Sequence, residues 1–148
     1  MNNLFARSIS TFAVFVLLAL PLSAAHAFNP SRWEGHYKGT WVNTYTNDCF
    51  ESGDTGSIAI NLITVETDGT ISSATVKFSD GSKLSATGSI YTKKGTRHIR
   101  LNYSYDDTTY YLIKGKLNDS EKINGTYLHA DSSCAAGWGG TVKAHHRD

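Results

Sequence analysis

Residues 56–78 have the sequence GSIAINLITVETDGTISSATVKF, and this stretch decides the fold class. Apolar and polar side chains alternate on both sides of Asp68-Gly69, with Ile58, Ile60 and Leu62 on one face of the first run. Such alternation is typical of a strand with one buried face, and Asp-Gly fits the tight turn of a β-hairpin. The stretch therefore predicts two antiparallel strands joined by a short turn.

The same pattern continues in both directions, interrupted by turn signals such as Asp80-Gly81, Lys94-Gly95 and Asp106-Asp107. The predicted strands are residues 35–45, 56–67, 70–78, 83–92, 97–105, 109–117, 122–129 and 137–145. Short consecutive hairpins and an even number of strands favour an up-and-down barrel, in which the first and last strands pair. We therefore predict an all-β fold, a small antiparallel β-barrel of eight strands.

Glycines recur before a polar residue and then a large one, and examples are Gly39, Gly125 and Gly140. Glycine inside a strand usually marks a bend or a place where another backbone comes close. In a small barrel, such positions let the strands coil around the axis. We interpret these glycines as part of the architecture.

The first 27 residues indicate export. They carry one charge, Arg7, then an apolar run from Phe12 to Leu20 and the small-residue sequence Ala25-His26-Ala27. This order is that of a secretory signal peptide, and the apolar run is too short to span a bilayer. We predict a signal peptide at 1–27, a single barrel domain at 28–148, and a periplasmic or secreted protein.

The charge balance and residue composition exclude several classes of fold and of binding partner. Without Arg7 the chain has 13 basic and 13 acidic residues, so no net positive charge favours nucleic acid or an anionic membrane. Threonine, tyrosine and glycine are abundant, which excludes disorder, a coiled coil and a helix bundle. Polar residues such as Lys77 and Arg100 occupy the face opposite the apolar one. An outer-membrane barrel has the reverse pattern, so we expect no membrane span.

Cys49 follows the first predicted strand and Cys134 precedes the last. In eight alternating strands both positions lie at the same end of the barrel, on the two strands that must meet. Cysteine pairs in exported proteins are usually oxidised, so we predict a disulfide that closes the barrel; two free buried thiols are the alternative. Placing Cys49 opposite Cys134 also sets the register, with Trp41 near position 142.

Two segments resemble a known family. Gly39-Thr40-Trp41-Val42-Asn43 and Thr67-Asp68-Gly69-Thr70-Ile71 are similar to the opening of avidin-like barrels, over about the first third of the mature chain. The avidin and lipocalin group shares an eight-stranded up-and-down barrel. The resemblance implies this architecture and a capacity to bind ligands, but it does not extend to a biotin site.

Five aromatic residues are expected to point inward: Tyr37, Trp41, Tyr103, Tyr127 and Trp138. Aromatic side chains at a barrel mouth suit ligands with an apolar body and a polar edge. They are equally suited to fill a core, because an eight-stranded barrel holds either packed side chains or one small ligand. These residues are the candidate ligand contacts, and both alternatives stay open. We expect Trp41 and Trp138 to share one wall.

The predicted function is an exported, non-enzymatic module that binds a small apolar or aromatic ligand, without cofactor or metal. The alternative is an interaction protein, such as an inhibitor of a secreted enzyme, that acts through its mouth loops. Asp54-Thr55-Gly56-Ser57 matches the aspartic-protease tetrapeptide. That aspartate normally follows an apolar strand, whereas Glu51-Ser52-Gly53 precedes it here, so we interpret the match as chance.

Two weaker metal hypotheses remain. One rim of the predicted barrel gathers Asp48, Glu51, Asp54, Asp80, Asp106, Asp107 and Asp131. Such oxygen ligands suit Ca²⁺, although aspartate is also a common turn residue. His36 and His145-His146 lie on the strands predicted to close the barrel. Without a supporting motif we interpret them as solvated histidines.

Overall fold

The structure is a computed structural model that describes residues 28–44, 51–105, 108–131 and 134–147. Within these ranges the side chains of 105, 108, 129–131 and 134–138 are not described. The predicted signal peptide lies outside the described residues. No helix in the described part of the chain is long and apolar enough to cross a bilayer.

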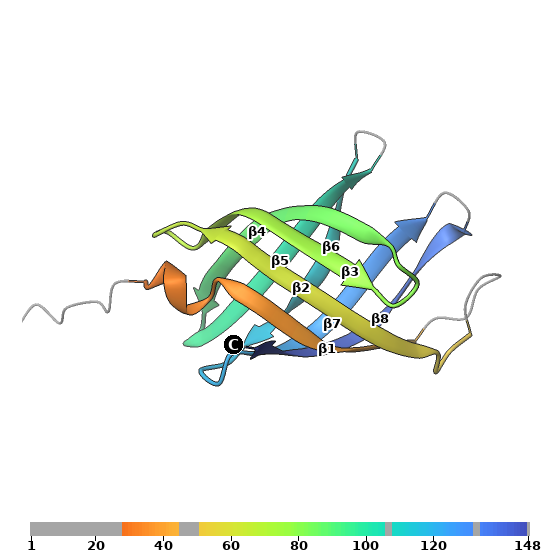
Figure 1. The fold of residues 1–148 in the computed structure, drawn as a ribbon, viewed down its shortest axis with the longest axis horizontal. Coiled ribbons are helices and arrows are strands. Elements are labelled where there is room, and N and C mark those ends of the chain that lie inside the picture. The colour runs from red at the N-terminus through yellow and green to blue at the C-terminus, as the bar shows by residue number, and fades with distance from the viewer. Residues whose placement is uncertain (1–27, 45–50, 106–107, 132–133, 148) are drawn as a thin grey trace, which may run out of the picture.

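Eight strands form one closed antiparallel barrel in chain order (Figure 1). They are β1 (Gly35–Asn43), β2 (Thr55–Val65), β3 (Thr70–Phe78), β4 (Lys83–Lys93), β5 (Thr96–Tyr105), β6 (Thr108–Leu117), β7 (Lys122–Asp131) and β8 (Cys134–Arg147). Each strand pairs with the next, and β8 pairs with β1. The predicted fold class and the order of the eight strands are therefore confirmed.

The other strand bounds agree with the sequence prediction or differ from it by one or two residues, and two features differ more. A short 3₁₀ helix, η1 (Pro30–Arg32), precedes β1, and proline at its first position is pre-set for such a turn. β8 begins at Cys134 instead of residue 137, because Cys134 pairs with Asp131 of β7. The small residues at the start of β8 show no alternation of apolar and polar residues. The sequence therefore shows no sign of a strand there, and only the pairing with β7 identifies it.

The register between β1 and β8 agrees with the one predicted from the cysteines. Trp41 lies opposite Val142, and Asn43 lies opposite Gly140. Cys49 itself lies outside the described residues, and the side chain of Cys134 is not described. The register is thus confirmed, whereas the disulfide stays a prediction.

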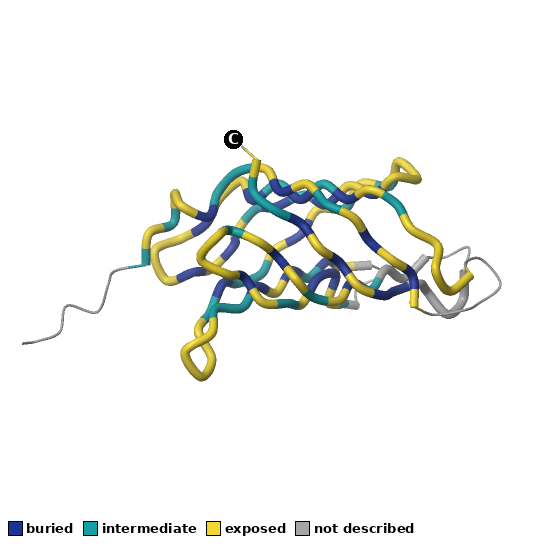
Figure 2. The backbone as a smooth tube through the Cα atoms, turned by 90° about the horizontal axis from the view of Figure 1, so that it is seen from below, coloured by how far each residue is buried: buried dark blue, intermediate teal, exposed yellow. Residues whose placement is uncertain are grey.

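Buried and exposed residues alternate along most strands (Figure 2). The expected inward residues of β2, β3 and β5 are buried: Ile58, Ile60, Leu62, Ala74, Val76, Phe78, Ile99, Leu101 and Tyr103. They belong to one hydrophobic cluster that fills the barrel. Burial of this apolar surface is the main driving force of the fold.

Trp33, directly after η1, belongs to this cluster at one end of the barrel and is 1% exposed. The guanidinium carbons of Arg32 and Arg97 lie 4.7 and 4.6 Å from its ring centroid. Arg97 also forms an ion pair with Asp119, and Arg32 forms one with Glu121. This end, here called the closed end, therefore joins η1 to the turns around it.

Glycines allow neighbouring strands to approach closely, as the sequence pattern predicted. A Cβ atom at Gly39 would overlap the carbonyl oxygen of Lys143 on β8. A Cβ atom at Gly140 would overlap the carbonyl oxygen of Val42 on β1. Both contacts are with backbone, which a side-chain rotation cannot relieve. The pairing of β1 with β8 thus depends on residues without side chains.

Replacing Gly39 with alanine tests this dependence. We expect Gly39→Ala to lower the free energy of unfolding by about 1–3 kcal/mol, because β1 and β8 must move apart. The control is Thr40→Ala at the next, exposed position, with an effect of roughly 0.5 kcal/mol or less. Urea denaturation measures both, and equal midpoints would show that the strands do not constrain each other here.

Candidate functional site

Four of the five predicted aromatic contacts are buried: Tyr37, Trp41, Tyr103 and Tyr127. The side chain of Trp138 lies outside the described residues, so its predicted place beside Trp41 stays untested. The role of all five as ligand contacts is likewise a prediction that the structure does not test.

The structure brings some of these aromatic rings together. The ring centroids of Trp41 and Tyr127 are 5.9 Å apart, and those of Tyr127 and Phe78 are also 5.9 Å apart. Aromatic pairs at this spacing stabilise a core. Tyr103 instead lies beside Tyr110, with centroids 5.7 Å apart. Trp41, Tyr127 and Phe78 therefore form one aromatic cluster, and their mutual contacts are those of core residues.

Tyr37 belongs to the closed end. Its hydroxyl donates a hydrogen bond to the carbonyl of Trp33 at 3.0 Å, and its ring centroid is 5.0 Å from that of His146. Burial raises the pKa of Tyr37, and the charge of Glu121 raises it further, while Arg32 lowers it in part. Burial also raises the pKa of Tyr127, and Asp54 adds to this effect. Both phenols are therefore neutral at physiological pH.

The wall of the barrel opens between β4 and β5, and pairing between β6 and β7 likewise stops, at Ile113 opposite Tyr127, before either strand ends. Pairing between β4 and β5 runs from Lys93 opposite Thr96 as far as Thr87 opposite Asn102. Both strands continue beyond this point, since β4 begins at Lys83 and β5 ends at Tyr105. The β3–β4 and β5–β6 hairpins diverge from there towards their tips (Figure 1).

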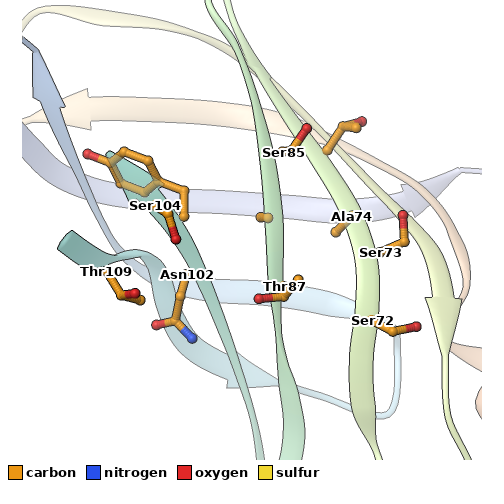
Figure 3. Close-up of a pocket in the computed structure, with 11 residues that line it drawn as sticks. Ser72, Ser73, Ala74, Ser85, Thr87, Asn102, Ser104 and Thr109 are labelled. Atoms are coloured by element: carbon orange, nitrogen blue, oxygen red, sulfur yellow. The ribbon is translucent and has the colours of Figure 1, made fainter. Parts of the chain in front are cut away.

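A pocket of about 460 Å³ lies in this opening, and we call it the lateral pocket (Figure 3). Polar residues with exposed or half-buried side chains border it: Ser85, Thr87, Asn102, Ser104 and Thr109. These side chains offer uncharged hydroxyl groups and the amide of Asn102, whose Oδ1 already accepts a hydrogen bond from Arg100 Nε at 2.9 Å. Its volume is within the usual range for small-ligand sites.

The lateral pocket reaches past the strands towards the interior. Exposed Ser85 and buried Ala86 are consecutive in β4, and both line it. Half-buried Asn102 and buried Tyr103 do the same in β5. Because consecutive residues of a strand point to opposite faces, the pocket extends between β4 and β5. Its inner lining is Ala74, Ala86 and Tyr103.

A second pocket, of about 830 Å³, lies at the closed end beside Phe28, Trp33 and Tyr91. Arg32 and Arg97 also line it. Their guanidinium groups are already paired with carboxylates, as described above. The carboxylates therefore compensate the positive charge of both arginines. As a result, this pocket would attract an anionic ligand less strongly than a pocket with two unpaired arginines.

Asp54 is exposed and immediately precedes β2. Its Oδ2 accepts a hydrogen bond from the backbone N–H of Glu51 at 3.0 Å. This local contact joins Asp54 to the start of the turn that precedes β2. Asp54 therefore stabilises the chain ahead of β2, which agrees with the interpretation of the tetrapeptide as a chance match.

The metal hypotheses gain no support. The described residues contain no group of three or more His, Cys, Asp or Glu side chains placed to hold an ion. Asp48, Asp106 and Asp107 of the acidic rim lie outside those residues. His146 contacts Glu121, with 3.1 Å between Nδ1 and Oε2, and its Nε2 lies 3.0 Å from the carbonyl oxygen of Glu34.

Comparisons with family models, with curated proteins and with solved structures found no match to this chain. The closed eight-stranded barrel agrees with the architecture implied by the avidin and lipocalin resemblance. No family is assigned by these comparisons. The function must therefore be inferred from the geometry of the barrel and its pockets.

Alkaline titration tests the buried phenols. Tyrosine in an unfolded chain ionises near pH 10, whereas folding raises the pKa of Tyr37 and Tyr127. Their contribution to stability is complete below about pH 10 and is lost as the pH rises further, because only the unfolded chain then releases these protons readily. We expect Tyr37→Phe to reduce this alkaline loss, because it removes one of the two buried phenols.

The measurement is urea unfolding at a series of alkaline pH values, followed together with phenolate absorbance. If every tyrosine ionised at its ordinary pKa while the barrel stayed folded, the assignment of Tyr37 and Tyr127 as buried neutral groups would be wrong.

Proposed function

We propose that this protein is an exported, non-enzymatic binding module that holds a small neutral ligand in the lateral pocket. The observation that supports this most directly is the neutral polar opening where β4 and β5 stop pairing. A closed barrel has no need for such an opening to complete its core. A ligand would find hydrogen-bonding groups at the surface and an apolar inner lining behind them.

The chemistry of the lining selects the ligand. None of the residues that line the lateral pocket is charged, so an ionic ligand would lose water without gaining a counter-charge. A purely apolar ligand would cover the hydroxyls of Ser85 and Thr87 without pairing them, which costs binding energy. The proposal thus replaces the apolar or aromatic ligand expected from sequence with a neutral ligand that carries hydrogen-bonding groups.

Two sequence features support export and ligand binding. The first 27 residues have the pattern of a signal peptide, which fits a periplasmic or secreted protein. The resemblance of Gly39–Asn43 to the opening of avidin-like barrels favours a ligand-binding role. A disulfide between Cys49 and Cys134 is part of the same proposal. It is supported by the register from His36 to Asn43, which is the one that this pairing requires.

Mass analysis tests the disulfide. We expect the exported protein to gain the mass of one hydrogen atom per cysteine on reduction, and to resist alkylation before it. Reduction should also lower the free energy of unfolding by up to about 4–5 kcal/mol, because the bond closes a long loop. Two alkylatable thiols in protein taken from the periplasm or medium would rule the bond out.

Native mass spectrometry of protein purified from its own host tests the ligand. We expect a small neutral molecule to be retained by the wild type. Thr87→Val removes a hydroxyl of the lateral pocket at constant volume and should weaken retention about tenfold, the upper value for one hydrogen bond. The control, Thr141→Val, changes an exposed threonine of β8 that does not line this pocket. Equal retention by both variants would place the ligand elsewhere.

A further inference from the structure

The hairpin between β4 and β5 determines which backbone groups point into the lateral pocket. Its turn is Lys94-Gly95, with φ of 50° and 73°, and Lys93 faces Thr96 across it. In a two-residue hairpin the pair that flanks the turn exchanges both backbone hydrogen bonds, and every second pair after it does the same. Counting along the ladder, the last such pair is Thr87 with Asn102.

The next hydrogen-bonded pair of this ladder would be Ser85 with Ser104. Pairing between β4 and β5 has ended by then, although both residues remain in strands. Alternation directs the backbone groups of Ala86 and Tyr103 to the outer neighbours, β3 and β6, and those of Ser85 and Ser104 into the opening. Two short strand edges therefore face each other across the lateral pocket.

These edges lack most of the usual protection against pairing with another chain. Proteins commonly guard a strand edge with proline, charged side chains or a covering loop. Between Leu84 and Thr87 on β4, and between Asn102 and Ser104 on β5, there is no proline and no charge. Ser85 and Ser104 have small exposed side chains that leave the backbone accessible. Lys83, at the outer end of β4, is the charged residue nearest to the opening along that strand.

We infer that the ligand of the lateral pocket is an extended peptide segment that adds a strand at these edges. This inference rests on the proposed function, because it assumes that the lateral pocket is the binding site. Backbone pairing with Ser104 of β5 and Ser85 of β4 supplies the affinity, as in other cases of strand addition. Since β4 and β5 are antiparallel, the added strand runs antiparallel to one and parallel to the other.

The residues that line the lateral pocket determine which side chains such a peptide can carry. Residues that point inward meet Ala74, Ala86 and Tyr103, which favours small apolar side chains. Residues that point outward meet the hydroxyls of Ser85 and Thr87, which favours neutral polar side chains. The segment therefore alternates small apolar and neutral polar residues, and it carries no charge in its middle.

Selection from a phage-displayed library of short random peptides tests the inference, followed by titration of the selected synthetic peptides against the full mature chain. We expect neutral, alternating sequences to be enriched. Ser104→Pro removes the N–H that faces the opening and should weaken binding about tenfold or more. Ser104→Ala keeps this N–H and removes only the hydroxyl, so the loss should be about threefold or less. Thr141→Val on β8 serves as the control outside the pocket.

Proline at a strand edge whose N–H faces outward is compatible with the sheet. Urea denaturation checks that Ser104→Pro is folded, and Ser85→Pro on the opposite edge is the second variant should it not be. We expect either folded proline variant to lose peptide binding. Binding that survives in a folded proline variant overturns strand addition.

Two further outcomes also overturn the inference. One is a library from which no peptide is enriched. The other is a dimer, detected by light scattering at rising concentration, that disappears in Ser104→Pro; the occupant would then be a second copy of this chain. The proposed function fails separately. A small molecule retained in native mass spectrometry and lost in Thr87→Val supports the lateral pocket as the site even when no peptide binds.

Discussion

Closure of the sheet on itself is the constraint on which the rest of the structure depends. The first and last strands are left without a free edge only if β1 meets β8 in register, and the structure pairs them from His36 to Asn43. The interior is then narrow, and neighbouring backbones come very close where the strands coil. Gly39 and Gly140 permit this approach on the two sides of the closing seam. Hydrophobic burial drives the chain to collapse. Closure of the barrel adds a second requirement, namely residues without a side chain where β1 and β8 approach each other most closely.

The closed end shows how firmly one side of the barrel is tied. Glu121 adopts a left-handed φ of 55°, which is costly for a residue with a side chain. Its carboxylate is held by Arg32, at 3.5 Å, and by His146, at 3.1 Å. Arg32 in turn lies over Trp33. These contacts link the segment before β1, the β6–β7 turn and β8, so the strands at this end cannot spread apart independently.

Much of this fold could be predicted from the sequence, because period-two alternation and turn residues act locally. The alternation in residues 56–78 and the glycine of Lys94-Gly95 are examples, and the structure confirms the strands on either side of them. The cysteine positions even predicted the seam, with Trp41 opposite Val142. The lateral pocket could not be predicted in this way. The alternation of inward and outward residues continues through Ser85 and Ser104. The local sequence therefore gives no indication that β4 and β5 stop pairing there.

Small inner residues accompany the opening between β4 and β5. Near the seam and on β7 the interior is filled by large side chains, with Trp41 against Tyr127. Beside the opening the inward residues of β3 and β4 are Ala74 and Ala86. Alanine covers little of the interior, so few contacts hold the tips of the β3–β4 and β5–β6 hairpins together. Filling that space with larger side chains would gain core contacts, whereas the alanines keep a route from the neutral polar surface to Tyr103. The small inner residues and the interrupted pairing thus occur together. At the lateral pocket the barrel has both fewer core contacts and fewer pairs between strands.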